Sequence, residues 1–528
     1  MMRVFSTGSI VAALWLAATS AAWAETYHVA PGGSDEADGS SGTPWATLQH
    51  AADTVGPGDE VLVADGNYAG FQLETSGTES TRITFTAEAD AAVIDSDGPT
   101  GDGIRLQRVS YVTIEGFHIQ GTSERGLAHR GANPDEPVFG LIIRGNTIED
   151  AGREGMYLSE VSDSLVEGNT ILRSGASGAD RTHGIYLANA GSDGTTIRGN
   201  HIAESGTAGI HFNGDLSIGG DGVISGLVVE RNIIHDNGQN GLNMDGVQDS
   251  LIRNNVIYDN ASNGIRAYAI DAAEGPRGLV IFNNTIYVPP DAGWCVRITE
   301  DGGDDVVFNN ILLSDAWGGS IGLDDTAGFA SAHNIVVERF TPDRDDTVLD
   351  LSEWQALGYD EGSFVATAAE LFVSMTDRDF LLAADSPAID QGLATFLGND
   401  APDVDQRGFT RPAGDAVDIG AYEEGAVADG DGDGDGDGDG DGDGDGDGDG
   451  DGDGDGDGDG DGDGDGDGDG DGDGDGDGDS DGDSDGDGGD EGCQCAAPGQ
   501  SEGGTVVTRL LRLLDVRSSC LRESLVEF

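Results

Sequence analysis

The protein has 528 residues, a formal net charge of −76 and four cysteines, and all 25 of its basic residues are Arg. Such an acidic chain repels a phosphate backbone, which excludes a general nucleic-acid-binding role. A chain without Lys also excludes any mechanism that needs a Lys base. Three of the four cysteines follow residue 490, so no disulfide framework is expected in the rest of the chain.

Residues 1–24 are predicted to be a secretory signal peptide. Arg3 is followed by an apolar run from Ile10 to Ala18 and then by Ala22-Trp23-Ala24, which fits a small-x-small cleavage site. The run is too short to cross a membrane, and no later apolar run is long enough. We therefore expect an exported protein, secreted or on the cell surface, without a transmembrane span.

The next segment predicts a strand and then a short amphipathic helix. Thr43-Pro44 suits a helix start. Apolar residues follow at helical spacing: Trp45, Leu48, Ala52 and Val55. A helix here would cap the open end of a stacked fold. The stretches YHVAPGGSD, PWATLQHAA and PGDEVLVADGNY together resemble the entry segment of secreted right-handed parallel β-helix proteins of the pectate-lyase-like superfamily.

The middle of the chain repeats one pattern. THGIYL, AGIHFN, NGLNMD and NGIRAY begin at residues 182, 208, 240 and 263, and their apolar residues alternate with the period of a strand. A second phrase places Asn before an apolar residue at steps of 23 to 32 residues: Asn146, Asn169, Asn200, Asn232, Asn255, Asn284, Asn310 and Asn334. Self-similarity at such a period indicates a solenoid.

We therefore predict an all-β fold, a parallel β-helix over residues 25–340 with a short N-terminal capping helix. The resemblance implies that it is right-handed. The recurring Asn is expected to be structural, because it tolerates left-handed backbone at a bend and because stacked amides satisfy one another. We expect a monomer.

Three further segments follow the coils. Residues 341–427 form a predicted closing or cap region, in which SPAIDQG (386–392) and VDQRGFTRPAGDAVDIGAYE (404–423) resemble the terminal segment of many surface-attached bacterial β-helix proteins. Residues 428–491 are mainly alternating Asp and Gly, supply 32 of the 76 net negative charges, and are predicted to be a disordered spacer. In residues 492–528, Cys493-Gln494-Cys495 resembles a degenerate surface-anchoring tail of myxobacterial type, whose apolar span is interrupted by Arg509 and Arg512.

Two columns of outward-facing residues carry the functional prediction. Strand alternation stacks the first column and then the second: Arg105, Tyr157, Tyr186, His211, Asn243, Arg266 and Arg297; Gln107, Ser159, Ala188, Asn213, Asp245, Tyr268 and Thr299. Aromatic rings that face sugars, and amides and guanidinium groups that face hydroxyls and carboxylates, suit an oligosaccharide groove. The alternative is that these side chains only stabilise the strand ladder.

Our first functional hypothesis is a polysaccharide lyase or epimerase that acts on a uronate-containing glycan. The predicted catalytic residues are His211, Arg266, Asp245 and His183. The predicted substrate-binding residues are Tyr157, Tyr186, Asn213, Asn243, Tyr268 and Arg297. Because an acidic body repels a polyanion, we expect a bridging Ca²⁺ with Asp215, Asp221 and Asp245 as candidate ligands.

Two alternatives stay open on the sequence. One is a non-catalytic glycan-binding or adhesive rod displayed on an acidic stalk. The other is a glycoside hydrolase that uses paired carboxylates from Asp215, Asp245 and Asp271, which lie on or near neighbouring coils.

Overall fold

The computed structural model describes residues 24–88, 91–131, 134–175, 182–300 and 302–427. The predicted signal peptide (all but Ala24), the Asp-Gly spacer and the Cys-containing tail lie outside the described residues. No helix in the described ranges is long and apolar enough to cross a membrane.

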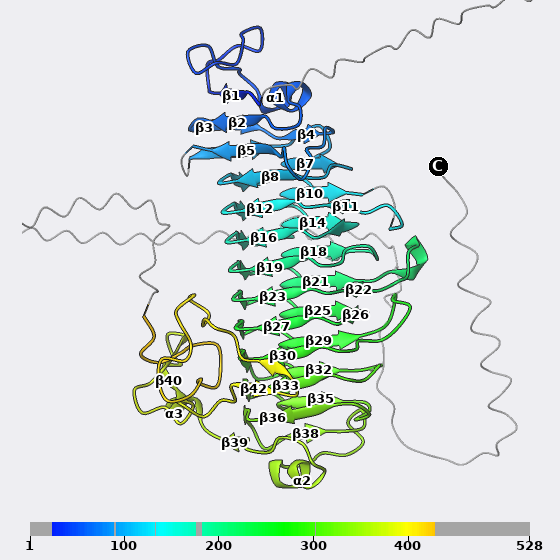
Figure 1. The fold of residues 1–528 in the computed structure, drawn as a ribbon, viewed down its shortest axis with the longest axis vertical. Helices are drawn as coiled ribbons and strands as arrows, with labels where there is room; N and C mark the ends of the chain where they lie inside the picture. Colours follow the sequence, from blue (N-terminus) through cyan, green and yellow to red (C-terminus); the bar gives the residue numbers. More distant parts are fainter. Residues whose placement is uncertain (1–23, 89–90, 132–133, 176–181, 301, 428–528) are drawn as a thin grey trace, which may run out of the picture. The chain divides into compact units, whose positions relative to one another are not determined.

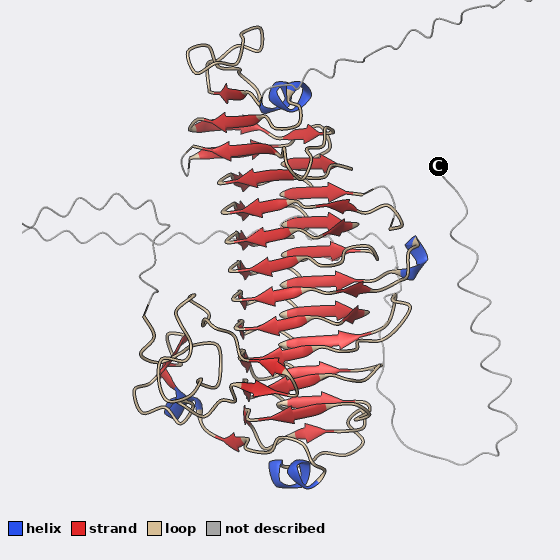
Figure 2. Ribbon diagram, in the orientation of Figure 1, coloured by secondary structure: helices blue, strands red, loops and turns tan. Residues whose placement is uncertain are grey.

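Short parallel strands coil around one core and form three long sheets (Figures 1 and 2). Sheet A has 12 strands in the order β1 (Thr26–Val29), β2 (Glu60–Val63), β5 (Ile83–Ala87), β8 (Val112–Glu115), β12 (Ile142–Arg144), β16 (Leu165–Glu167), β19 (Thr196–Arg198), β23 (Val228–Glu230), β27 (Leu251–Arg253), β30 (Val280–Phe282), β33 (Val306–Phe308) and β36 (Ala330–Ala332).

Sheet B has 11 strands in the order β4 (Phe71–Leu73), β7 (Ile104–Gln107), β10 (Leu127–Arg130), β14 (Met156–Ser159), β18 (Ile185–Ala188), β21 (Ile210–Asn213), β25 (Leu242–Asp245), β29 (Ile265–Tyr268), β32 (Val296–Ile298), β35 (Ile321–Leu323) and β38 (Phe340–Thr341). Sheet C has 12 strands in the order β3 (Gly66–Ala69), β6 (Ala92–Ser96), β9 (His118–Gln120), β13 (Thr147–Glu149), β17 (Thr170–Leu172), β20 (His201–Ala203), β24 (Ile233–His235), β28 (Val256–Tyr258), β31 (Thr285–Val288), β34 (Ile311–Ser314), β37 (Ile335–Val336) and β39 (Phe364–Val365). The predicted parallel β-helix is confirmed.

Alternation along each strand explains the core. In β18 and β21, Ile185 pairs with Ile210 and Leu187 with Phe212, and all four side chains are fully buried. Each coil covers the apolar face of its neighbour, and a fully buried side chain of this size stabilises the fold by about 1.5–3 kcal/mol. Stacking therefore stabilises strands of two to five residues that could not stand alone.

The recurring Asn residues form a buried ladder, as predicted. From Asn146 to Asn310, each side-chain Nδ2 donates to the Oδ1 of the next Asn at 2.9–3.0 Å, and the last, Asn334, donates to Asp360 Oδ1 at 2.8 Å. The prediction that these Asn residues adopt left-handed backbone is wrong. The left-handed residue is the one before each of them, for example Gly168 at φ 63° and Asn283 at φ 52°.

The predicted capping helix is present as α1 (Leu48–Thr54), which packs against the edge strand β4. Gln49 donates from its side chain to the carbonyl of Gln72 at 3.0 Å and accepts from the Gln72 N–H at 2.9 Å, so it satisfies the open edge of sheet B. The predicted start at Thr43-Pro44 is wrong, because Thr47 caps the helix by accepting from the His50 N–H at 3.2 Å.

The last described segment folds back along the coils. Its elements are α2 (Leu351–Ala356), α3 (Ala368–Leu371), β40 (Phe372–Ser374), β41 (Asp379–Leu382), β42 (Thr395–Phe396) and β43 (Asn399–Asp400). The left-handed corner residues dock it: Asn254 donates to Val404 O at 2.7 Å, and Asn309 to Leu393 O at 2.8 Å. In this segment α2 lies at the end of the coils next to β38, where Trp354 stacks on Phe340, and the part from α3 onward lies to the side of the coils (Figure 1).

Candidate functional site

The outer face of sheet B carries both predicted columns, and its strand register aligns them. Tyr186 pairs with His211, His211 with Asn243, and Asn243 with Arg266. The predicted columns omit the coil that contains β10. β10 places Ala128 and Arg130 between the members of the first and second columns that belong to β7 and β14.

Two neighbouring cavities open on this face. The histidine cavity has a volume of about 610 Å³ and lies over β18, β21, β25 and β29; its polar lining includes Thr182, His183, Tyr186, Thr207, His211, Asn213, Gln239, Asn243, Asp245, Tyr268 and Asp271. The arginine cavity has a volume of about 460 Å³; its charged and aromatic lining comprises Arg266, Asp291, Trp294, Arg297, Glu300, Trp317, Arg344 and Asp345. Ile270 lines both cavities, so they are adjacent, and the two together are called the groove.

Two of the predicted catalytic residues, His183 and His211, are in contact. The Ala208 N–H donates to Nδ1 of His183 at 3.3 Å, so in the neutral ring the proton lies on Nε2. That Nε2 is 3.0 Å from Nδ1 of His211 and donates to it. In this arrangement a neutral His211 carries its own proton on Nε2 and can donate a hydrogen bond from that atom, while its role as a base stays a prediction.

Tyr and Asn side chains hold one another in place along the histidine cavity. Asn213 Nδ2 donates to the Tyr186 hydroxyl at 3.0 Å, and Asn243 Nδ2 donates to the Tyr268 hydroxyl at 2.7 Å. Burial raises the pKa of Tyr268 to about 12, so its hydroxyl stays protonated. The ring of Tyr186 also stacks on His211 with centroids 4.8 Å apart. The cavity wall is thus preorganised.

Tyr157 lies outside both cavities. Its ring is covered by the guanidinium groups of Arg125 and Arg130, whose Cζ atoms lie 4.8 and 5.2 Å from the ring centroid. Its predicted contact with a sugar would have to be made beyond the histidine cavity.

Asp245 has a different environment from the one expected. Its side chain is 2% exposed, and its carboxylate accepts from the backbone N–H groups of Ile270, Asp271 and Ala272 at 2.9, 3.0 and 3.4 Å. Burial raises the pKa of Asp245 despite these hydrogen bonds. The residue anchors the loop that carries Ile270.

The proposed calcium ligands do not form one site. Asp215 accepts from the Ser217 N–H at 2.8 Å and Asp221 from the Val223 N–H at 3.2 Å, each within its own turn, while Asp245 is occupied as described. Among the described residues, no group of three or more His, Cys, Asp or Glu side chains is arranged to hold a metal ion. These three carboxylates therefore do not fit a common Ca²⁺, and calcium binding by the chain stays a prediction.

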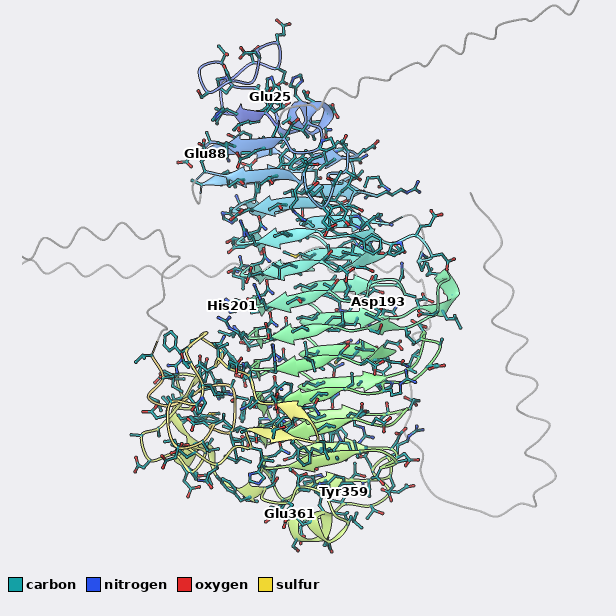
Figure 3. All side chains as sticks on the ribbon, in the orientation of Figure 1. Glu25, Glu88, Asp193, His201, Tyr359 and Glu361 are labelled. Atoms are coloured by element: carbon teal, nitrogen blue, oxygen red, sulfur yellow. The ribbon has the colours of Figure 1, made fainter. Side chains whose placement is uncertain are left out.

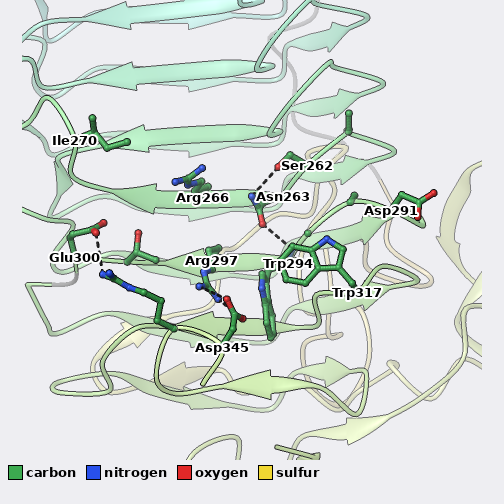
Figure 4. A pocket seen from close by; sticks show the side chains of 15 residues that line it. Ser262, Asn263, Arg266, Ile270, Asp291, Trp294, Arg297, Glu300, Trp317 and Asp345 are labelled. Atoms are coloured by element: carbon green, nitrogen blue, oxygen red, sulfur yellow. Dashed lines mark hydrogen bonds and ion pairs between the residues drawn. The ribbon is translucent and has the colours of Figure 1, made fainter. Parts of the chain in front are cut away.

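The arginine cavity contains functional candidates that the columns did not reveal (Figure 4). Arg297 pairs with Asp345 through two hydrogen bonds of 3.0 and 2.8 Å. Trp317 is 59% exposed, whereas Trp294 is only 1% exposed. Arg297 belongs to β32 and to the first predicted column, whereas Trp294 and Trp317 come from loops and Asp345 from the segment after β38, where no repeat marks their positions. An exposed Trp in a loop beside the Arg column was the available signal.

Comparisons with known proteins agree with this architecture. Residues 27–214 match the family model of the Pel9A-like right-handed β-helix region, and residues 223–316 match that of the periplasmic copper-binding protein NosD. The uncharacterized protein YwoF of Bacillus subtilis (strain 168) is 26% identical over 208 residues, which are 35% of this chain and 43% of YwoF.

A solved structure shows the same fold. Pectate lyase Pel9A matches with a TM-score of 0.52 at 18% identity, over 76% of this chain and 96% of that one. An alginate lyase from Paenibacillus sp. strain FPU-7 matches with a TM-score of 0.39 at 21% identity, over 59% and 99% of the two chains. The protein is therefore a right-handed parallel β-helix protein with a pectate-lyase-like fold.

Proposed function

We propose that the protein is exported and binds a uronate-containing polysaccharide in the groove of sheet B, where it acts as a lyase or an epimerase. The observation that carries this proposal is Arg266, which lines the arginine cavity on the strand next to that of Asn243 and makes no ion pair with any described residue. A guanidinium group pairs well with a uronate carboxylate, and the aromatic rings on both sides suit the apolar faces of sugars.

Both reactions begin with removal of the proton at C5 of a uronate, which builds negative charge on the carboxyl group. Arg266 suits the neutralisation of that charge, because Arg keeps its proton in proteins. In a lyase, an exposed carboxylate of the groove, such as that of Asp271, accepts the C5 proton, the C5–H electron pair forms the C4–C5 double bond, the C4–O bond breaks, and the departing oxygen takes a proton from water. His211 suits a hydrogen bond to that oxygen, since a neutral imidazole can act as an electrophilic donor.

A non-catalytic glycan-binding rod is the second candidate. This candidate is favoured because two charged residues of the groove already have partners within the protein. Asp245 accepts hydrogen bonds from backbone N–H groups, and Arg297 forms an ion pair with Asp345. The hydrolase alternative has less support, because the carboxylate of Asp245 is occupied by the loop that carries Asp271.

The experiment is incubation of the full chain with pectate, alginate and glycosaminoglycans, followed by ultraviolet absorbance of the unsaturated uronate, by C5 epimer analysis and by a binding measurement. We expect turnover of at least one of these glycans. His211→Ala should lower its rate at least about tenfold, because the variant lacks one hydrogen bond that stabilises the transition state.

His201→Ala is the matched control, because His201 contacts His235 at 2.8 Å on sheet C, away from the groove (Figure 3). Binding without turnover would establish the rod. Neither binding nor turnover on any acidic glycan would refute the proposal.

A further inference from the structure

The arginine cavity offers a single uncompensated positive charge. Among its charged residues, Arg297 is held by Asp345, and Arg344 is held by Glu300 at 3.2 Å and by Asp324 at 2.7 Å. Arg266 has no carboxylate partner among the described residues, and its guanidinium lies 4.8 Å from the Tyr268 ring centroid. One carboxylate of a bound glycan can therefore be neutralised here without breaking an existing ion pair.

The histidine cavity is built for uncharged sugars. No Arg lines it, and its two carboxyl groups belong to Asp245, which is buried, and Asp271, which is exposed and makes no ion pair with a described residue. The other polar groups are hydroxyls, amides and two imidazoles, and Nδ1 of His183 accepts a hydrogen bond from the Ala208 N–H, so that nitrogen carries no proton. A uronate in this cavity would face Asp271 without a compensating cation, which is unfavourable.

The two cavities are close enough to hold neighbouring units of one chain. Asn243 of the histidine cavity and Arg266 of the arginine cavity are register partners on β25 and β29, and adjacent strands lie about 4.8 Å apart. Ile270, 71% exposed, lines both cavities and offers an apolar contact where they meet. An extended glycan along sheet B would thus place successive sugars beside different sets of side chains, one set in each cavity.

We propose that the groove selects a mixed polysaccharide, in which a uronate at Arg266 adjoins a neutral or N-acetylated sugar in the histidine cavity, over a polymer of uronates alone. This inference rests on the proposed glycan-binding function and specifies its substrate class. A polyuronate would bring several carboxylates into a groove where, among the described residues, Arg266 is the one cation without an ion pair and Asp271 and Asp291 are carboxylates without one.

The test is calorimetric titration of the full chain in EDTA with two sets of oligosaccharides of equal length. The mixed set contains hyaluronan, chondroitin and rhamnogalacturonan fragments, and the uniform set contains oligogalacturonate and oligomannuronate. We expect at least one mixed glycan to bind at least about tenfold more tightly than either uniform one, as for a charge-assisted contact made without added repulsion.

Two variants locate the effect. Arg266→Gln should lower the affinity for the preferred mixed glycan about tenfold or more, and Asp271→Asn should raise the affinity for oligogalacturonate several-fold. Arg144→Gln removes an exposed ion pair with Glu115 on sheet A and should change neither affinity.

Equal or tighter binding of a uniform polyuronate would overturn the inference and leave the proposed function standing. Equal losses in Arg144→Gln and Arg266→Gln would also overturn it. Binding of neither set would refute the proposed function, and the inference would fall with it.

Discussion

His129 is a polar residue in the core, at a position where neighbouring coils carry Leu106 and Leu158. The ring is fully buried; its Nδ1–H donates to Ser159 O at 3.1 Å, while Nε2 has no hydrogen-bond partner among the described residues. Burial lowers the pKa of His129 to about 4. The folded protein therefore holds the neutral imidazole, and protonation favours the unfolded chain.

This depression of the pKa predicts an acid-sensitive fold. The unfolded pKa is about 6.5, so the contribution of His129 to stability is complete above that pH and is lost as the pH falls towards 4, at a cost of about 3 kcal/mol. His129→Leu should remove this part of the loss. Urea unfolding of both proteins at pH 7 and pH 4.5 measures it, and an unchanged difference between the two pH values in the variant would contradict the assignment.

The Asn ladder predicts large costs for single truncations. Asn232→Ala removes the acceptor that Asn200 Nδ2 uses at 3.0 Å and the donor that Asn255 Oδ1 receives. The Asn200 N–H and the Ile197 carbonyl also lose their bonds to this side chain, so four buried groups each lose a partner and we expect destabilisation of about 2–4 kcal/mol by thermal or urea unfolding. Asn67→Ala, at an exposed site, is the matched control and should change stability by less than about 0.5 kcal/mol. Similar values for both would contradict the role of the ladder.

The residue directly before each ladder Asn, here called the corner residue, differs between coils that contact the closing segment and coils that do not. The open corners before Asn146, Asn169 and Asn200 are Gly145, Gly168 and Gly199, while the later corners are Arg231, Asn254, Asn283, Asn309 and His333, all with positive φ. The later residues reach the closing segment; His333 Nδ1, for instance, lies 2.9 Å from Gln391 O. A side chain is present where a partner segment docks.

This contrast predicts opposite outcomes for two exchanges. Asn254→Gly combined with Asn309→Gly keeps the left-handed backbone but removes the bonds to Val404 and Leu393, so the closing segment should be released at a cost of about 1–3 kcal/mol per site. Gly168→Asn should cost little, because an added Cβ would meet open space and Asn tolerates the left-handed backbone at φ 63° better than most residues do. Limited proteolysis within 385–424 measures the release, and equal protection in wild type and double variant would argue against docking by these side chains.

The elements that the sequence could not reveal share a physical cause. β10 was missed because Ala128 and His129 interrupt the expected alternation of apolar and polar residues. Asp245 was assigned to catalysis or metal binding because the sequence of its own strand does not indicate its contacts with a loop that begins 25 residues later. That loop donates three backbone N–H groups to the carboxylate. Local periodicity of the sequence predicts the positions of the strands and of the ladder Asn residues. Contacts between a strand and a distant loop produce no periodic pattern in the sequence.

At the scale of the whole protein, the same reasoning separates fold from site. The sequence alone predicted the β-helix, the buried Asn ladder and the alignment of Tyr186, His211, Asn243 and Arg266. All three depend on aligning successive repeats residue by residue. The arginine cavity depends on Trp317 and on Asp345, which comes from the segment after β38. These irregular segments give the groove its second half.

The central claim, that the groove of sheet B binds an acidic glycan, is tested most directly by tryptophan fluorescence of the full chain during titration with hyaluronan, chondroitin, rhamnogalacturonan, pectate and alginate fragments. Trp317 lines the groove and is exposed, so a bound sugar should change its emission. We predict a saturable change with at least one of these glycans that is lost in Trp317→Ala and weakened about tenfold or more in Arg266→Gln, but kept in Arg144→Gln. An unchanged spectrum with every glycan, or equal responses of wild type and Arg266→Gln, would contradict the account.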